Sequence, residues 1–332
     1  MADTSATNEL FGFDFQTNAA IVIMLEHIKD VKTIRLEGKE DIEIQLNDDH
    51  YILSQAKAVV KSSTDFKNVR RNLKKALISL SNAANSTQKI KQLVYITNSP
   101  NPFNEKILNS IFYGEAHREF TSLQGPLQKI IRNYLSEITL PLDPSKLMIQ
   151  ILPFETDIDK ERYKCILNKV ENFIYKLGRI RVSEDELHGI WVNDIFKSGT
   201  RNNQELKLTK KDIIWPVIVF ATNDMNYDEF DCDDSEIEEI NRLYKELINN
   251  SCEKYEFITK ILSSYNVFQK EKNNKERVEN FIKIKYEDYL YILEGENLVM
   301  ADDIKIKLLK IIIHNILYKR IQINNIKKGV NL

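Results

Sequence analysis

Three polar side chains near the start of the chain have types and spacing that suit phosphodiester hydrolysis: Asp41, Gln55 and Lys57. A carboxylate and an amide oxygen are hard ligands of the kind that Mg²⁺ prefers. An ammonium beside such an ion can orient or deprotonate an attacking water, or offset charge on the scissile phosphate. Together the three residues predict metal-dependent cleavage of a nucleic-acid backbone.

Two neighbouring strands must bring these side chains together. The stretch 41–46 alternates polar and aliphatic residues, and 51–57 follows it after a short polar turn, so the two segments predict an antiparallel hairpin. Asp41 starts the first strand, whereas Gln55 and Lys57 end the second. Because both places are far from the turn, the three side chains should lie at the same edge. An alternative is that Asp41 and Lys57 merely form a surface ion pair across the two strands.

The surrounding pattern predicts a mixed sheet flanked by helices. Apolar residues recur at helical spacing in 11–29 and 64–84, while 32–37 and 93–97 have the composition of strands. The order is then α-β-β-β-α-β, which is an α+β or α/β class of fold.

A boundary is expected where two prolines interrupt the chain at Leu140-Pro-Leu-Asp-Pro144. We therefore expect a first domain over 1–140 and a second, mainly helical domain over 141–332. The second part contains one predicted strand, at 146–152, followed by segments with helical periodicity. Its role is expected to be regulation or assembly.

Composition excludes several classes of protein. Hydrophobic residues make up 42% and the formal net charge is −2, so the chain should fold without a general attraction to nucleic acid. Three cysteines and no long apolar segment give no sign of a disulfide framework or a membrane span. The sequence also has no glycine-rich phosphate loop for ATP. We expect a cytoplasmic protein without membrane contact.

A run of basic residues follows the predicted active site and contains a single acid, Asp65. Such residues, spaced three or four apart on a helix, can contact phosphates without reading sequence. The alternative is an ordinary solvated helix face. The candidate DNA-binding residues are Lys61, Lys67, Arg70, Arg71, Lys74 and Lys75.

These motifs together resemble the PD-(D/E)xK nucleases, which have a restriction-endonuclease-like fold. Glu40-Asp41 is followed after one turn by Gln55-Ala56-Lys57, and the upstream segment 12–16 reads Gly-Phe-Asp-Phe-Gln. The chain is most similar to the branch with Gln in the (D/E) place, found in antiphage effectors of CBASS and Lamassu systems. The resemblance covers roughly residues 9–97.

The resemblance implies that Asp41, Gln55 and Lys57 form the active site, with Mg²⁺ as cofactor and Mn²⁺ as a possible substitute. Gln55 departs from the fuller motif because an amide carries no negative charge, so a neighbouring acid should compensate. Glu37 and Glu40 are the candidate metal ligands. Gln16 and Glu26, on the first helix, are expected to support the site.

By the same resemblance, the expected role is that of a double-stranded DNA endonuclease in a Lamassu-like antiphage complex. An SMC-like ATPase and a small connecting subunit would restrain it, and release would let it form a homo-oligomer and cut. Two alternatives are a nuclease activated by a cyclic oligonucleotide and a catalytically inactive DNA-binding or scaffold protein.

Overall fold

The structure is a computed structural model, and it divides the chain into two compact units. It describes residues 4–105, 109–155, 159–178, 182–201, 203, 205–222, 230, 232–248, 253–268, 273–293 and 301–332. Unit 1 consists of Met1–Phe173 and Ser183–Lys210, and unit 2 consists of Ile174–Val182 and Lys211–Leu332. Each unit is described below by itself.

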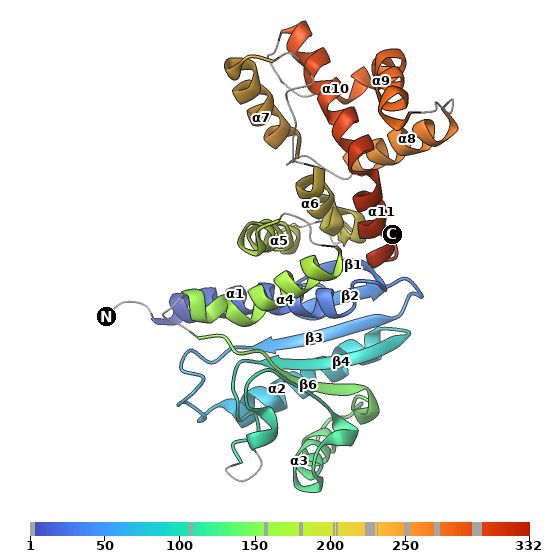
Figure 1. The fold of residues 1–332 in the computed structure, drawn as a ribbon. Helices are drawn as coiled ribbons and strands as arrows, with labels where there is room; N and C mark the ends of the chain where they lie inside the picture. The colour runs from blue at the N-terminus through green and yellow to red at the C-terminus, as the bar shows by residue number, and fades with distance from the viewer. Residues whose placement is uncertain are drawn as a thin grey trace. The chain divides into compact units, whose positions relative to one another are not determined.

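Unit 1 is built around a seven-stranded mixed sheet in the order β5-β6-β4-β3-β2-β1-β7 (Figure 1). The strands β1, β2 and β3 form the expected antiparallel meander, whereas β3, β4 and β6 run parallel to one another. The expectation of a mixed sheet flanked by helices is therefore confirmed. The strands are β1 (Val31–Leu36), β2 (Ile42–Leu46), β3 (Tyr51–Lys57), β4 (Ile90–Thr97), β5 (Ala116–Glu119), β6 (Leu147–Ile151) and β7 (Leu208–Thr209).

Alternating aliphatic residues fix the register of the meander. Ile44 of β2 lies opposite Ile34 of β1 and Ile52 of β3, and all three side chains are fully buried. A shift by one residue would turn this aliphatic row to the other face, so the register is strongly specified. Both connecting turns use a residue with positive φ, Glu37 at 51° and Asp49 at 62°.

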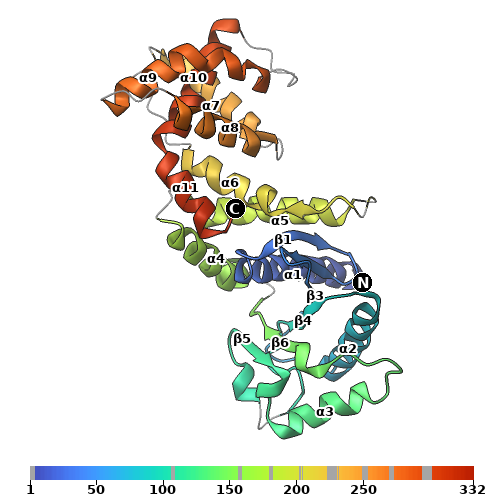
Figure 2. The ribbon, with the colours of Figure 1, turned by 90° about the vertical axis from the view of Figure 1, so that its right-hand side faces the viewer.

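Helices cover both faces of the sheet (Figure 1). One face carries α1 (Thr4–Glu26) and α4 (Asp159–Lys176), and the other carries α2 (Val69–Ser86) and α3 (Gly125–Leu135). A continuous hydrophobic cluster joins α2 and α3 to the sheet. On the opposite side, α5 (Glu184–Gly199) packs against α1, where the rings of Phe13 and Phe196 lie 5.2 Å apart (Figure 2).

The boundary expected at residue 140 falls inside unit 1 and has to be moved. The proline-containing loop after α3 leads through a short 3₁₀ helix into β6, which pairs with β4 along Leu93↔Leu147 to Thr97↔Ile151. The segment that we had expected to open a second domain is thus a strand of the same sheet. Two prolines mark a loop, but a loop within a domain and a linker between domains share that composition.

Unit 2 is helical, as expected for the C-terminal part. Its helices bury an aliphatic and aromatic core that includes Ile261, Phe281, Leu308 and Ile316. The elements after β7 are α6 (Lys210–Thr222), α7 (Asp234–Ile248), α8 (Glu253–Val267), α9 (Asn274–Lys285), α10 (Asp302–Tyr318) and α11 (Arg320–Gly329). The 3₁₀ helices of the chain are η1 (Asn109–Phe112), η2 (Phe120–Ser122), η3 (Pro144–Lys146) and η4 (Tyr286–Ile292).

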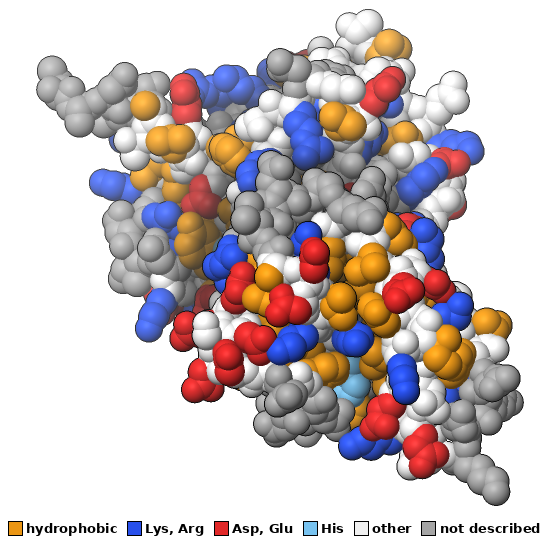
Figure 3. Space-filling model, turned by 90° about the horizontal axis from the view of Figure 1, so that it is seen from above, with side chains coloured by type: hydrophobic (Ala, Val, Ile, Leu, Met, Phe, Trp, Pro, Cys, Tyr) orange, Lys and Arg blue, Asp and Glu red, His pale blue; other side chains and the backbone are white. Residues whose placement is uncertain are grey.

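Charged side chains of both signs are mixed on the face drawn in Figure 3, where Lys and Arg lie among Asp and Glu. This agrees with the net charge of −2 and means that any nucleic-acid surface has to be local. Among the described residues, no helix combines the length and the apolar character needed to cross a membrane.

Candidate metal and nucleic-acid site

The structure brings Asp41, Gln55 and Lys57 together at one edge of the sheet. Oδ2 of Asp41 accepts a 2.9 Å hydrogen bond from the backbone N–H of Ala56 and another from Nε2 of Gln55. Nζ of Lys57 lies 3.6 Å from the same oxygen. Carboxylate, amide and ammonium thus meet at one point, as the predicted hairpin requires.

The hairpin register explains this meeting. Ile42 of β2 lies opposite Ser54 of β3, and the next step places Asp41 beside Gln55. Lys57 follows two residues later on the same face of β3, because side chains alternate along a strand. Asp41 itself closes the β1–β2 turn, where its carbonyl oxygen accepts a 3.1 Å hydrogen bond from the N–H of Glu37.

Gln16 of α1 supports this turn from the side. Its amide nitrogen donates 2.8 Å hydrogen bonds to Oε1 of Glu37 and to the carbonyl oxygen of Asp41. The side chain is 7% exposed, so the amide is held in place by burial as well as by hydrogen bonds. Gln16 therefore positions both the turn and the carboxylate of Glu37.

Glu40 reaches the site from the same turn and is buried. Its Oε1 accepts a 2.7 Å hydrogen bond from the hydroxyl of Ser79 on α2. Burial raises the pKa of Glu40 to about 7, and the charge of Asp41 adds to this effect. Burial also raises the pKa of Asp41, which the neighbouring Lys57 ammonium partly counteracts. The site holds desolvated carboxylates with one ammonium among them.

Such a set of side chains fits a divalent cation. A positive ion would favour the ionised forms of Asp41 and Glu40, whose pKa values burial raises. The hydrogen bonds and the ion pair described for Asp41 all engage Oδ2, which leaves Oδ1 for a ligand bond. Gln55 turns its amide nitrogen toward Asp41, and a half-turn of the amide would present its oxygen instead. These oxygen donors suit Mg²⁺, and Mn²⁺ accepts the same kind of ligand.

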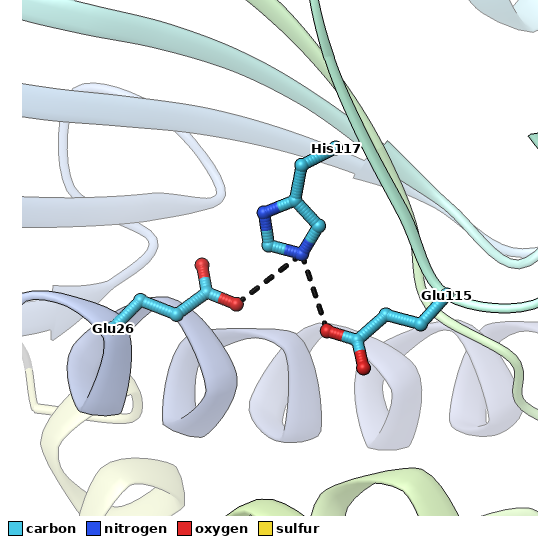
Figure 4. A group of neighbouring side chains, drawn as sticks. All are labelled: Glu26, Glu115 and His117. Atoms are coloured by element: carbon cyan, nitrogen blue, oxygen red, sulfur yellow. Dashed lines mark hydrogen bonds and ion pairs between the residues drawn. The ribbon is translucent and has the colours of Figure 1, made fainter.

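Glu26 does not join this site, contrary to our expectation of a supporting role. It lies ten residues after Gln16 on α1, a rise of about 15 Å along the helix. Its carboxylate contacts His117, as Figure 4 shows, and it also contacts Gln150 and Lys169. Sequence proximity to Gln16 is misleading here because a helix carries residues ten positions apart to different ends of a sheet.

Two of the predicted DNA-binding residues are engaged in ion pairs. Arg70 pairs with Glu105 and donates a 2.6 Å hydrogen bond to the carbonyl of Phe103, and Lys74 lies 2.5 Å from Glu137. The helix itself begins at Val69 rather than at residue 64. Lys61 and Lys67 are exposed and precede it, so the expected row of basic residues on one helix is shorter than predicted.

Arg71 and Lys75 form the remaining part of the basic run on α2. Both side chains are exposed, and within the described residues neither takes part in an ion pair. They are four residues apart and thus share a flank, and Ser79 is the next residue along it. Because Ser79 binds Glu40, this flank leads directly to the candidate metal site.

Ser79 and Asn98 are two positioning residues that the sequence analysis did not identify. The amide of Asn98 binds both backbone polar groups of Val59, at 2.8 Å and 2.9 Å, and thereby fixes the segment that follows Lys57. A polar residue directly after a parallel strand is the signal that could have identified Asn98, since such strand ends often border sites. Ser79 could have been found because it lies four residues after Lys75 and therefore on the same flank of the helix.

Comparison of the chain with protein-family models, with curated proteins and with solved structures finds no match in any of the three.

Proposed function

We propose that unit 1 is a Mg²⁺-dependent DNA endonuclease with a restriction-endonuclease-like fold. The observation that carries the proposal is the convergence of Asp41, Gln55 and Lys57 on one point at the end of a two-strand hairpin. Surface ion pairs alone would not need a buried glutamine and a backbone N–H directed at the same carboxylate oxygen. The resemblance of the Asp41…Gln55-Ala56-Lys57 pattern to PD-(D/E)xK nucleases supports the same conclusion.

Each side chain then has a defined role. Asp41 and the amide oxygen of Gln55 hold the ion, and Glu37 and Glu40 supply the negative charge that Gln55 lacks. When bound, Mg²⁺ offsets charge on the scissile phosphate and lowers the pKa of a coordinated water. Lys57 holds the attacking water or stabilises the charge that develops on the phosphate. Gln16 keeps the turn that carries Glu37 and Asp41 in place.

Double-stranded DNA is the substrate that we assign. The exposed pair Arg71 and Lys75 lies on the flank of α2 that ends at Ser79 and Glu40, and Lys61 and Lys67 precede the helix. Basic side chains arranged along a DNA backbone can hold a duplex in place without reading its sequence. A DNA backbone that lies along this flank would bring a phosphodiester to the metal site.

The cellular role that we propose is that of an effector subunit in a Lamassu-like antiphage complex. The helical unit 2 would serve as the control or assembly module, held by an SMC-like ATPase and a small connecting subunit until DNA is sensed. Release would allow the nuclease to form a homo-oligomer and cut. The sequence supports this division of labour because it carries a candidate cutter and no glycine-rich ATP loop.

The direct test is incubation of the full chain with plasmid DNA in the presence of Mg²⁺, Mn²⁺ or a chelator. We expect cleavage with either metal, none with the chelator, and none by Asp41→Ala. Cleavage that persists in Asp41→Ala would end the assignment of this site. Because partner subunits are proposed to restrain the enzyme, the assay uses the chain without them.

A second candidate is a DNA-binding scaffold without catalysis, and one observation favours it. Ala56, Gln55 and Lys57 together satisfy one oxygen of Asp41, so the site is already internally bonded. A protein that binds duplex DNA in a salt-dependent manner, yet cuts with neither metal, would establish this alternative.

A further inference from the structure

A second group of ligand-type side chains lies in unit 1 away from Asp41. Glu26 at the end of α1 faces Glu115 and His117, which lie just before and within β5 (Figure 4). One ligand atom of each residue lies within 4.8 Å of the others. We refer to Glu26, Glu115 and His117 as the Glu26 cluster. It joins two parts of the chain that are about ninety residues apart in sequence.

The spacing within the cluster matches that of ligands around one small cation. Nε2 of His117 lies 3.4 Å from Oε1 of Glu26 and 3.2 Å from Oε1 of Glu115. Ligand bonds of about 2.1 Å in a tetrahedral zinc site give ligand–ligand separations of about 3.4 Å.

A buried amide points into the same group and is incompletely satisfied. Gln150 of β6 is fully buried, and its Nε2 lies 3.1 Å from Nε2 of His117 and 3.2 Å from Oε1 of Glu26. Its Oε1 is buried and has no hydrogen-bond partner among the described residues. A buried carbonyl-type oxygen without a partner costs free energy and needs an explanation.

The groups around the imidazole of His117 do not all suit one protonation state of its Nε2. Two carboxylate oxygens and one amide nitrogen surround Nε2 of His117. If Nε2 carries a proton, it can donate to Glu115 or Glu26, but it also lies against the amide nitrogen of Gln150, which is a second donor; if it carries none, its lone pair faces the oxygens of Glu26 and Glu115. A cation at the centre removes this conflict, because lone pairs of nitrogen and oxygen can all point at it. A half-turn of the Gln150 amide adds its unpartnered oxygen as a fourth ligand.

The ammonium of Lys169 on α4 places a positive charge beside the two carboxylates of the cluster. Its ammonium lies 3.0 Å from Oε1 of Glu26 and also contacts Oε1 of Glu115. The side chain is 22% exposed, so it can swing toward solvent when another cation takes its place. Cys165 contacts the other oxygen of Glu115, with its Sγ 3.4 Å from Oε2, and the grouped ligand atoms are those of Glu26, Glu115 and His117.

We propose that the Glu26 cluster and Gln150 form a binding site for a divalent transition-metal ion, for which Zn²⁺ is the probe. The ligands are the Nε2 of His117, one oxygen each from Glu26 and Glu115, and the amide oxygen of Gln150. A set with one imidazole nitrogen and carboxylate oxygens favours zinc-type ions over Mg²⁺. The bound ion ties α1, β5 and β6 together, which is a structural role separate from the nuclease site proposed above.

The test is equilibrium dialysis of the full chain against Zn²⁺, combined with thermal unfolding. We expect His117→Ala and the near-isosteric Glu115→Gln to bind one Zn²⁺ fewer per chain than the wild type, with affinity at the site reduced about 100-fold or more. Zn²⁺ should raise the melting temperature of the wild type but not of these variants, because it binds only the folded chain. Lys169→Met should tighten binding about tenfold by removing the competing ammonium.

Two control variants locate the site. His50→Ala removes a histidine from the β2–β3 turn and should bind zinc as the wild type does. Asp41→Ala should keep this Zn²⁺ as well, which separates the failure of this proposal from that of the nuclease proposal. A wild type whose melting temperature does not respond to Zn²⁺, or a folded His117→Ala chain that binds as many zinc ions as the wild type, would overturn the inference. Circular dichroism establishes that the variants are folded.

Discussion

The hydroxyl of Ser79 donates a 2.7 Å hydrogen bond to Oε1 of Glu40, and this contact joins the basic flank of α2 to the turn that carries Asp41. A helix that holds DNA and a turn that holds a metal ion must keep a fixed distance for a phosphodiester to reach the ion. Placement errors as small as about 1 Å cost roughly a hundredfold in rate. In the proposed nuclease, Ser79 is therefore a positioning residue, which acts through Glu40.

We expect Lys57→Ala to abolish DNA cleavage and to leave folding intact. Lys57 ends β3 with a side chain that is 33% exposed, so its removal opens no cavity in the core. Plasmid cleavage with Mg²⁺ measures the effect, and unfolding by urea checks stability. Lys32→Ala is the matched control, because Lys32 also lies on a strand of this sheet and its ammonium also forms an ion pair, 2.8 Å from Asp49. A variant without Lys57 that still cuts would remove it from the active site.

Gln55→Glu should bind Mg²⁺ about tenfold more tightly, because a carboxylate replaces a neutral amide as a ligand. The measurement is a titration of metal binding by calorimetry in the absence of DNA. Gln45→Glu makes the same change on β2 near the turn, where Gln45 bonds to Asp49, and should leave the affinity unchanged. Equal metal affinity in Gln55→Glu and the wild type would show that residue 55 does not coordinate.

Arg71→Gln combined with Lys75→Gln should weaken DNA binding equally for all sequences. Each lost phosphate contact lowers the slope of log affinity against log salt by about 0.9, so the pair should lower it by about 2. The control is Arg70→Gln with Lys74→Gln, which removes the same charge from residues engaged with Glu105 and Glu137. Binding measured at several salt concentrations distinguishes the pairs. The same slope in both double variants would place DNA on another surface.

The raised pKa of Glu40 predicts a dependence of stability on pH. Glu40 ionises near pH 4.5 in the unfolded chain and near 7 in the folded one, so between these values only the unfolded chain has released the proton. The contribution of Glu40 to the free energy of unfolding therefore falls as pH rises through this window, by at most about 3 kcal/mol.

Glu40→Gln removes this titration, and the amide oxygen of the glutamine can still accept the hydrogen bond from the hydroxyl of Ser79. Relative to the wild type, the variant should gain stability of the order of 2 kcal/mol between about pH 5 and pH 8. Urea unfolding at both pH values measures the difference. Mg²⁺ should reduce it, because a nearby cation favours the carboxylate of the wild type. A difference that is constant with pH would show that Glu40 ionises normally.

The hairpin that carries Asp41, Gln55 and Lys57 was predictable from sequence because its information is local. Alternating Ile42, Ile44 and Leu46 define one strand, a polar turn ends it, and the register then follows. The parallel pairing of β4 with β6 was not predictable in this way. Leu93 and Leu147 are joined through a long connection, and nothing in either segment specifies its partner.

The limits of the site prediction have the same physical origin. A basic run indicates charge, but only the fold shows that Glu105 and Glu137 reach Arg70 and Lys74 from distant positions in the chain. Glu26 was assigned to the wrong neighbourhood for a similar reason, since its partners Gln150 and Lys169 lie far away in sequence. Long-range pairs of polar side chains leave no periodic trace in a sequence.

The short strand β7 has a consequence for the order of events during synthesis. On the edge of β1 that faces away from β2, Thr33 and Ile34 pair with Thr209 and Leu208, so a ribosome must add more than a hundred further residues before this edge is covered. At roughly 5–20 residues per second, the nascent chain presents an open β1 edge for about ten seconds or longer. An unpaired edge can recruit strands from other chains. Chains released before Leu208 should consequently be prone to self-association, even though every residue of the proposed nuclease site has already been made.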